Sequence, residues 1–306
     1  MFEPARERQI SCLTLKSKTL SRLFWLNPII RKLNPLLKHI NLQLSFSRYQ
    51  AAVYFYPFRA DRRLYKNIKD SDECLVNFGS GGFFHTLWSN YDYPGSSSYY
   101  KYLQGKPGVD FTPIDLTLEN ALPFKPGQVS IIYCAHTIEH LPEAAAVRFL
   151  NDCARILKPG GRIRLVYPDF TFDVAKAKIL YDQAGGADDY FIRQCKYAAN
   201  HMFHPSAEFP DDYIVESLIN SDFDPENFLE LLKKRDANKG GFRPSNPEYH
   251  LSFWSHKKLT RLCDTLGFKK YIPELAGQSD VHIFRNTCVF DTTEPQLSSY
   301  GELLKA

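Results

Sequence analysis

Residues 129–167 read VSIIYCAHTIEHLPEAAAVRFLNDCARILKPGGRIRLVY, which is an apolar run, a helical pattern and a second apolar run. The two apolar runs, 129–135 and 162–167, are rich in β-branched residues and predict strands. Between them, 142–157 has helical periodicity, with Pro142 as a favourable first residue. The segment Lys158-Pro159-Gly160-Gly161 then ends the helix. A strand, a helix and a strand in this order predict two parallel strands joined by a crossover helix.

The same alternation of strands and helices continues on both sides of this stretch, beginning at Asp72. Further strands are predicted at 74–78, 86–91, 111–114, 268–272 and 298–304. Ser255 is expected to cap a helix that runs to Leu266, and Gly267 is expected to end that helix. The predicted fold class is therefore α/β, a Rossmann-like, doubly wound and mostly parallel sheet of seven strands with helices on both faces.

A helical lid is predicted as an insertion at about 170–249, within a main domain of residues 61–306. This segment has helical pieces such as 172–184 and 228–234, interrupted by Gly185-Gly186, Pro210 and Pro225. Because it is a long insertion beside the strand ends, we expect it to determine which acceptor enters the site.

A basic amphipathic arm is predicted at residues 1–60. The first 50 residues contain nine Lys and Arg but only two acids, Glu3 and Glu7. Apolar residues at 20–40 recur at helical spacing, and Pro28 and Pro35 divide them into short helical pieces. Such a segment is typical of a helix that lies on an anionic membrane surface. The alternative is that its apolar stripe packs on the main domain.

Composition excludes several classes of protein. The chain has 306 residues, 44% of them hydrophobic and 24% charged, which is typical of a soluble enzyme. The sequence contains no long apolar run and no secretory signal, so we expect a cytoplasmic protein. Seven scattered cysteines without a Cys-x-x-Cys pair argue against a disulfide framework and a zinc site. Outside the arm the chain is net negative, so no nucleic-acid partner is expected.

Three predicted strands end in residues suited to a nucleotide-like ligand. The first leads into Gly79-Ser80-Gly81-Gly82, where glycines let the backbone approach a ligand without a Cβ in the way. Asp92 ends the second strand, where a carboxylate can accept both hydroxyl protons of a ribose. Asp115 ends the third. Because strand ends of a doubly wound sheet converge, we expect all three to face one ligand, although each alone also suits a turn or helix cap.

Taken together and in chain order, the motifs resemble the class I S-adenosylmethionine-dependent methyltransferases, over about residues 72–169. The resemblance is strongest to small methyltransferases found with bacterial surface-glycan and lipopolysaccharide genes. It rests on Val76-Asn77-Phe78-Gly79-Ser80-Gly81, Trp88-Ser89-Asn90-Tyr91-Asp92, Asp115-Leu116, Leu122-Pro123-Phe124, Glu139-His140-Leu141 and Arg155-Ile156-Leu157-Lys158-Pro159-Gly160-Gly161.

This resemblance implies S-adenosyl-L-methionine as the cofactor. It assigns the glycine loop to the methionine part, Asp92 to the ribose, and Asp115 with Leu116 to the adenine. The implied cofactor-binding residues are Asn77, Gly79, Ser80, Gly81, Asp92, Asp115, Leu116 and His136. Asn77 departs from the family pattern, which has an acid at this position. An amide oxygen can accept a hydrogen bond from an ammonium group but supplies no charge.

The expected activity is methyl transfer to a small-molecule or glycan-type acceptor. A hydroxyl acceptor requires a base to remove its proton. Candidates at the strand ends and in the lid are His140, His136, Asp169 and His204. His136, Glu139 and His140 are spaced i, i+3 and i+4, but the sequence offers no third ligand at metal spacing, so no metal is expected.

Two alternatives to an active methyltransferase stay open at this point. One is a methyltransferase-like binding or scaffold module with weak or no activity, which Asn77 favours. The other is a nicotinamide-dependent oxidoreductase, which shares the glycine loop and the ribose acid. The Leu-Pro-Phe and Glu-His-Leu segments argue against the oxidoreductase.

Overall fold

The computed structural model describes residues 13–17, 42–46, 51–55, 73–81, 87–94, 111–203, 209–235, 249–287, 289–291 and 298–306, and also 29, 32–33, 36–37, 65, 104, 244 and 247. The chain divides into two units. The first comprises residues 1–72 and 276–292, and the second comprises residues 73–275 and 293–306. No pattern in the sequence predicted that residues 276–292 belong to the first unit.

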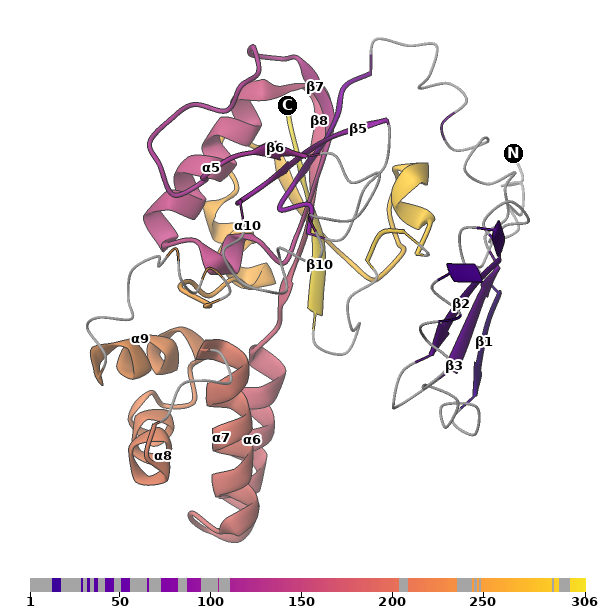
Figure 1. Ribbon diagram of the computed structural model, residues 1–306. Helices are drawn as coiled ribbons and strands as arrows, with labels where there is room; N and C mark the ends of the chain where they lie inside the picture. Colours follow the sequence, from indigo (N-terminus) through magenta and orange to yellow (C-terminus); the bar gives the residue numbers. More distant parts are fainter. Residues whose placement is uncertain are drawn as a thin grey trace, which may run out of the picture. The chain divides into compact units, whose positions relative to one another are not determined.

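A seven-stranded sheet with the order β6-β5-β4-β7-β8-β10-β9 forms the second unit (Figure 1). The strands are β4 (Leu75–Phe78), β5 (Trp88–Asp92), β6 (Thr112–Pro113), β7 (Val129–Ala135), β8 (Leu157–Pro168), β9 (Lys270–Glu274) and β10 (Ser298–Leu304). The first five are parallel, and β10 is antiparallel to both β8 and β9. The predicted seven-stranded, mostly parallel sheet is confirmed, with its switch point between β4 and β7.

The helix α5 (Glu143–Ile156) packs on this sheet and starts one residue later than predicted, because Pro142 is its N-cap. Its buried face includes Phe149, whose ring meets the ring of Phe78 edge-on at 5.3 Å. The segment Lys158-Pro159-Gly160-Gly161 lies within β8, where the pairing with β7 is irregular, and Gly160 has a φ of +74°. A Cβ on Gly161 would lie 2.9 Å from the carbonyl oxygen of Ser130, so the backbone conformation at Gly160 and the close strand contact at Gly161 both favour glycine.

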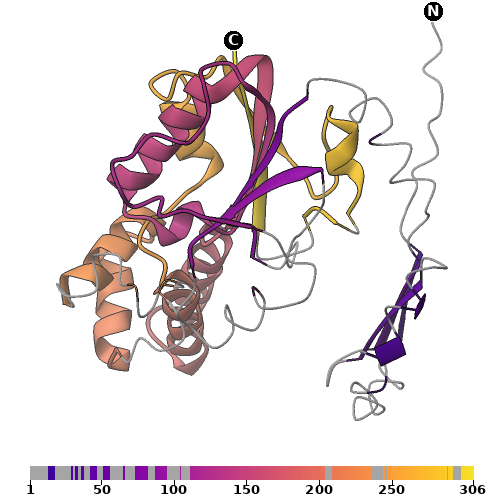
Figure 2. The same ribbon diagram turned by 45° about the horizontal axis from the view of Figure 1, so that its top comes forward.

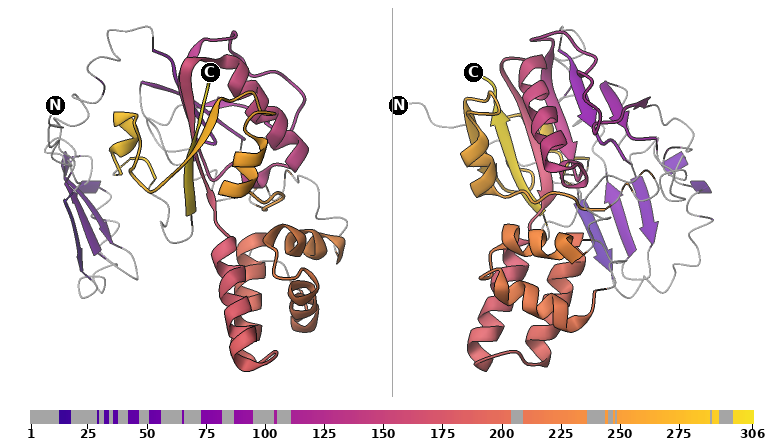
Figure 3. Two further views of the ribbon diagram at one scale, coloured as in Figure 1. Left: turned by 180° about the vertical axis from the view of Figure 1, so that it is seen from behind. Right: turned by 90° about the vertical axis from the view of Figure 1, so that its left-hand side faces the viewer.

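Ser255 caps helix α10 (His256–Leu262), as predicted, by accepting a hydrogen bond from the backbone N–H of Lys258. Gly267 ends this region with a φ of +76°. The backbone N–H of Phe268 still donates to the carbonyl of Cys263, so Phe268 closes the helix end. The last-but-one strand therefore starts at Lys270, two residues after its predicted start. Helices α5 and α10 lie on the same side of the sheet (Figures 1 and 3). The expectation that helices cover both faces therefore stays a prediction for the other face.

The chain leaves the carboxyl end of β8 into a group of four helices (Figures 1 and 2). They are α6 (Thr171–Ala184), α7 (Asp189–Phe203), α8 (Asp211–Asn220) and α9 (Pro225–Arg235). Gly185, in the left-handed conformation, ends α6, and the side chain of Asp188 accepts a hydrogen bond from the N–H of Phe191 at the start of α7. These helices share their own apolar core, which also takes in Phe170 and Phe253. The insertion is thus helical, and its action as a lid stays a prediction.

Three strands of the first unit form an antiparallel sheet with the order β1-β3-β2. They are β1 (Leu13–Ser17), β2 (Leu42–Phe46) and β3 (Ala51–Phe55). Parts of the predicted helical arm are therefore strands, in keeping with their period-two alternation, as in Leu42, Leu44 and Phe46. Most of the segment with helical spacing, 20–40, lies outside the described residues. The described residues there have helical backbone, and Ile29, Leu33 and Leu36 are exposed.

The short helices are η3 (Ile138–His140) in the second unit and η4 (His282–Arg285) in the first. Among the helices of the described part of the chain, none is long and apolar enough to cross a bilayer.

Candidate functional site

A pocket lies where β4, β5, β6 and β7 end. Each strand contributes the residue or residues that follow it: Gly79 after β4, Tyr93 after β5, Ile114 after β6 and His136 after β7. The full lining is Gly79, Asp92, Tyr93, Ile114, Asp115, Leu116, Thr117, His136, Thr137, His140, Leu141 and Pro247. Parallel strand ends thus meet at one site, as the sheet topology requires.

The glycine loop is a tight turn held against the end of β5. Gly79 has a φ of +69° and Gly81 a φ of +50°, values that disfavour any side chain. The backbone N–H groups of Gly79 and Ser80 donate to the carbonyl of Tyr91, at 2.9 and 3.1 Å. A Cβ on Gly79 would lie 1.9 Å from Oγ1 of Thr137. Gly79 is therefore required both by its backbone conformation and by the residue that faces it from the end of β7.

The carboxylate of Asp92 is the most enclosed charged group of the pocket wall. Only 6% of the residue is exposed. Its Oδ2 accepts hydrogen bonds from the N–H of Gly81 at 2.9 Å and from the side chain of Gln104 at 3.3 Å. Its Oδ1 accepts one from the N–H of Tyr93 at 2.8 Å. Burial raises the pKa of Asp92 above its usual value, and these hydrogen bonds offset only part of that effect.

Asp115 and Leu116 line the same pocket beside Ile114. Oδ1 of Asp115 accepts hydrogen bonds from the N–H and the hydroxyl of Thr117, at 2.9 and 2.6 Å. These bonds fix the turn that follows β6 and leave the second carboxylate oxygen for other contacts. The pKa of Tyr93 is raised by burial and by the charge of Asp115.

Three of the predicted cofactor-binding residues, Asn77, Ser80 and Gly81, do not line the pocket. Asn77 is buried within β4, opposite Asn90 of β5, and its amide donates to the Asn90 side chain at 3.4 Å. Neither Asn77 nor Ser80 is among the pocket-lining residues. The Ser80 hydroxyl is buried without a hydrogen-bond partner among the described residues, so it can still donate to a ligand.

His136 and His140 also line the pocket, and in the sequence they flank the buried Glu139. The part of the lining that these two histidines form is called the histidine end, or acceptor end, below. His136 has a φ of +48°, an uncommon conformation for a side chain of this size. Its Nδ1 lies 3.2 Å from Oε1 of Glu139, and its Nε2 lies 3.0 Å from the hydroxyl of Ser298. Burial alone would raise the pKa of Glu139, but His136 and the charges of His140 and His250 lower it to about 2. Glu139 is therefore a carboxylate at neutral pH.

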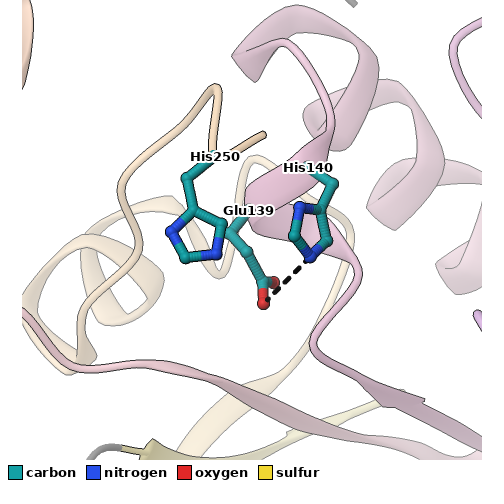
Figure 4. A group of neighbouring side chains, drawn as sticks. All are labelled: Glu139, His140 and His250. Atoms are coloured by element: carbon teal, nitrogen blue, oxygen red, sulfur yellow. Dashed lines mark ion pairs between the residues drawn. The ribbon is translucent and has the colours of Figure 1, made fainter. Parts of the chain in front are cut away.

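His250 joins Glu139 and His140 from a distant part of the chain. The backbone N–H groups of Leu251 and Ser252 both donate to the carbonyl of Glu139, at 2.6 and 3.1 Å. The His140 and His250 rings lie 5.0 Å apart, and both turn toward the Glu139 carboxylate (Figure 4). Burial and the charge of His140 lower the pKa of His250, which favours its neutral form.

Asp169 and His204 differ from the other predicted catalytic residues. Asp169 does not line the pocket. Its two oxygens accept hydrogen bonds from the N–H of Thr171 and the hydroxyl of Ser299, at 3.0 and 2.5 Å, which ties the start of α6 to β10. His204 lies outside the described residues, as do residues 82–86 of the glycine loop.

Thr137 and His250 belong to the site but were not predicted from the sequence. Thr137 lies between the predicted residues His136 and His140, and it faces Gly79 from the end of the neighbouring strand. Its effect is to exclude a Cβ at Gly79, which becomes evident only in the structure. His250 is more than one hundred residues from Glu139, so no spacing rule connects the two. The one available signal is that His250 precedes the Ser255 cap closely, which places it at the return of the chain to the sheet.

The Leu-Pro-Phe and Arg-Ile-Leu motifs are brought together by a polar contact. The Arg155 guanidinium donates to the carbonyls of Leu122 and Phe124, at 3.2 and 2.9 Å, and pairs with Asp152. Asp152 in turn accepts a hydrogen bond from the N–H of Leu122. These motifs therefore hold the segment between β6 and β7 against α5, and they do not line the pocket.

Comparison with known proteins finds that residues 94–165 match a family model described as a methyltransferase domain. The matched interval includes Asp115, Glu139 and His140 and begins after the glycine loop and Asp92. The match supports a class I S-adenosylmethionine-dependent methyltransferase with S-adenosyl-L-methionine as its cofactor. A search of the curated proteins finds no match.

Solved structures similar to this chain include three methyltransferases. One, described as SAM dependent and from Archaeoglobus fulgidus, is 13% identical with a TM-score of 0.37, over 81% of this chain and 93% of that chain. Another, from Aquifex aeolicus, is 10% identical with a TM-score of 0.34, over 79% and 89%. The CurJ carbon methyltransferase is 9% identical with a TM-score of 0.34, over 76% of this chain and 48% of that chain. This chain thus spans about half of the length of the CurJ chain.

Proposed function

We propose that this chain transfers the methyl group of S-adenosyl-L-methionine to a small-molecule or glycan-type acceptor. One observation carries the proposal. A single pocket joins residues suited to the nucleoside of the cofactor, namely Asp92, Asp115 and Leu116, to a histidine-lined end, His136 and His140. A cofactor and an acceptor must meet within one enclosed space for transfer to occur.

The residues of the cofactor end fit the proposed ligand. The buried Asp92 carboxylate would accept hydrogen bonds from the two ribose hydroxyls. Ile114 and Leu116 would provide apolar contact for the adenine, with Asp115 beside them. Gly79 keeps the loop free of a Cβ where the backbone comes close. When bound, the sulfonium supplies a methyl group already activated for displacement.

The acceptor end has to align the acceptor and exclude water. His136 and His140 are the titratable residues that line this end. In our proposal they orient an acceptor hydroxyl, and one of the two imidazoles accepts its proton as the bond from the acceptor oxygen to the methyl carbon forms. The bond from the methyl carbon to sulfur breaks in the same step, and S-adenosylhomocysteine is the leaving group. In this proposal Asp169 has a structural role, since one of its oxygens accepts a hydrogen bond from Thr171 of α6 and the other accepts one from Ser299 of β10. A glycan-type acceptor is favoured by the resemblance of the motifs to surface-glycan methyltransferases.

We further propose that helices α6–α9 select the acceptor. They follow directly from the carboxyl end of β8 (Figure 1), and α7 contacts the histidine end through the carbonyl of His201, which accepts a hydrogen bond from His250. Insertions at strand ends determine what enters such a site. Exposed-face substitutions on α6, such as Phe172→Ala, are expected to change acceptor preference while cofactor affinity stays the same.

Calorimetric titration with S-adenosylhomocysteine tests the cofactor assignment. The Asp92→Asn variant should bind at least about tenfold more weakly, since it loses charge-assisted hydrogen bonds worth roughly 1.5–3 kcal/mol each. Asp182→Asn removes an equal charge at an exposed position of α6 and should bind like the parent protein. A parallel titration with NAD separates the oxidoreductase alternative. Parent protein that binds no S-adenosylhomocysteine at about 1 mM, a very weak affinity, would contradict the proposal.

A further inference from the structure

The side chains of Glu139, His140 and His250 present three acceptor atoms to one small space. One atom from each residue lies within 4.8 Å of the other two. Figure 4 shows both imidazole rings with a nitrogen turned toward the carboxylate, and the marked pair joins Nε2 of His140 to Oε1 of Glu139, at 3.8 Å. This cluster is distinct from the i, i+3, i+4 set of the sequence, because its third member comes from the segment after the helical insertion.

The hydrogen bonds of the two rings determine which nitrogen faces the carboxylate. Nδ1–H of His140 donates to the carbonyl of Tyr249 at 3.2 Å, and Nδ1–H of His250 donates to the carbonyl of His201 at 2.9 Å. Since a carbonyl only accepts, Nδ1 carries the proton in each ring, and Nε2 of the neutral imidazole carries a lone pair. Both Nε2 lone pairs therefore face Glu139. Backbone carbonyls orient metal-binding histidines in this way.

The buried Glu139 carboxylate has Nδ1 of His136 at 3.2 Å from its Oε1, a contact outside normal hydrogen-bond geometry. Only 1% of the residue is exposed, and among the described residues neither oxygen has a hydrogen bond of normal geometry. A buried carboxylate that faces lone pairs is costly unless a cation balances it. A proton on Nε2 of His140 does not bridge 3.8 Å, because charge-assisted hydrogen bonds are about 2.7–2.9 Å long.

We infer that Glu139, His140 and His250 bind a divalent transition-metal ion of the Zn²⁺ type. Two imidazole nitrogens and one carboxylate are a common zinc ligand set, and they leave a fourth position open. Such an ion holds its ligands about 2.0–2.2 Å away, so neighbouring ligand atoms stand ~3.3 Å apart. The observed separations need to close by about 0.5–1.5 Å, which ring rotation and side-chain adjustment supply. Hard, oxygen-preferring ions such as Mg²⁺ are disfavoured by the two imidazoles.

The site adjoins the acceptor end of the pocket, because His140 is both a proposed ligand and a pocket-lining residue. An ion there would polarise an acceptor oxygen and make its proton easier to lose. This role rests on the proposed methyl transfer. The ion site itself does not, since it is defined by contacts within the chain.

Metal binding is measured directly on the full chain, produced without a histidine tag and stripped with a chelator. Titration with Co²⁺ should give the visible absorption of a four- or five-coordinate ion at one equivalent, and Zn²⁺ should displace it. The variants Glu139→Gln, His140→Ala and His250→Ala should each weaken metal binding by on the order of 100-fold or more. Loss of a residue that only orients a metal ligand already lowers metal affinity by about 10–100-fold, and loss of the ligand itself should lower it at least as much. The exposed His282→Ala is the matched control and should bind like the parent protein.

Several results would overturn the inference. Folded parent protein that takes up no Co²⁺ or Zn²⁺ at micromolar free ion overturns it, as does binding that survives all three substitutions. The His140 side chain is 19% exposed, whereas that of Glu139 is 1% exposed, so His140→Ala stays informative if Glu139→Gln does not fold, as judged by circular dichroism. A titration of the same samples with S-adenosylhomocysteine tests the cofactor proposal separately. Cofactor binding without metal binding would remove the ion site alone.

Discussion

Replacing Gly79 by alanine changes two terms in the free energy of unfolding. The first is the backbone term, since a residue with a Cβ at a φ of +69° costs about 1–2 kcal/mol. The second is overlap, because the new Cβ would lie 1.9 Å from Oγ1 of Thr137 and 2.9 Å from its Cβ and Cγ2. Thr137 cannot turn away cheaply, since its hydroxyl donates to the carbonyl of Ala135 at 3.0 Å. Overpacking of this kind costs about 1–3 kcal/mol.

The two terms together predict a loss of about 2–5 kcal/mol for Gly79→Ala, a large part of the stability of an ordinary domain. Gly127→Ala is the matched control, because Gly127 has a φ of +68° and no atom within 4 Å of a new Cβ. It should lose only the backbone term, about 1–2 kcal/mol. Urea unfolding measures both values, and calorimetry with S-adenosylhomocysteine measures the effect on the pocket.

The Thr137→Ala background separates the two terms for Gly79. It removes Oγ1 and Cγ2 and leaves one contact at 2.9 Å. The double variant Gly79→Ala/Thr137→Ala should therefore regain about 1 kcal/mol or more, which appears as a coupling energy in a double-mutant cycle. If Gly79→Ala is no more destabilising than Gly127→Ala, and cofactor affinity is equal in both, the assigned contact between the strand ends is wrong.

Three further predictions concern other parts of the chain. Cofactor affinity should be full at neutral pH and should fall on acidification, starting at a pH above the usual titration range of an aspartate. The reason is that burial raises the pKa of Asp92, and only its carboxylate form accepts hydrogen bonds from both ribose hydroxyls. Calorimetry between about pH 7.5 and 5 should show this dependence for the parent protein and not for Asp92→Asn. Lys258→Met should lower the free energy of unfolding, measured in urea, by about 1–2 kcal/mol, because the buried ammonium lies 2.9 Å from both Glu143 and Glu226. The loss should be smaller than for a fully buried ion pair, because both carboxylates are partly exposed. If the basic segment at 15–50 docks on membranes, the chain should sediment with anionic vesicles at low salt and should be released from them at high salt. Absence of vesicle binding, or unfolding of the protein when residues 1–50 are deleted, would instead favour packing of this segment on the main domain.

The strands of the sheet were predictable because each is a short apolar run bounded by turn residues. Val129–Ala135 and Ser298–Leu304 match the predicted bounds, since both are flanked by polar or irregular segments. The shift of β9 to Lys270 follows from the helix end before it, where Phe268 still bonds to Cys263. The strands at 13–17, 42–46 and 51–55 escaped prediction because their alternation is short and lies beside a stronger helical pattern.

The cofactor end of the pocket was predictable for a related reason. Gly79, Asp92 and Asp115 each lie at the end of a strand or within two residues of it, so topology alone brings them together. Asn77 shows the limit of that reasoning. A residue inside a strand points to one of the two faces, and here it meets Asn90 of the neighbouring strand and not the pocket.

The acceptor end depends on contacts that no local pattern encodes. Residues 251 and 252 donate to the carbonyl of Glu139, and this places the imidazole of His250 beside a carboxylate more than one hundred residues earlier. The same imidazole donates through Nδ1 to the carbonyl of His201 in α7, and His201 is held in turn by Asp173 of α6 at 2.6 Å. A shift of α7 would therefore move a proposed metal ligand, while, within the part of the chain that the structure describes, the glycine loop and Asp92 make no such contact with α6 or α7. It follows that changes in α6 and α7 should alter metal binding and acceptor choice together and leave cofactor affinity unchanged, which distinguishes a coupled acceptor end from two independent sites.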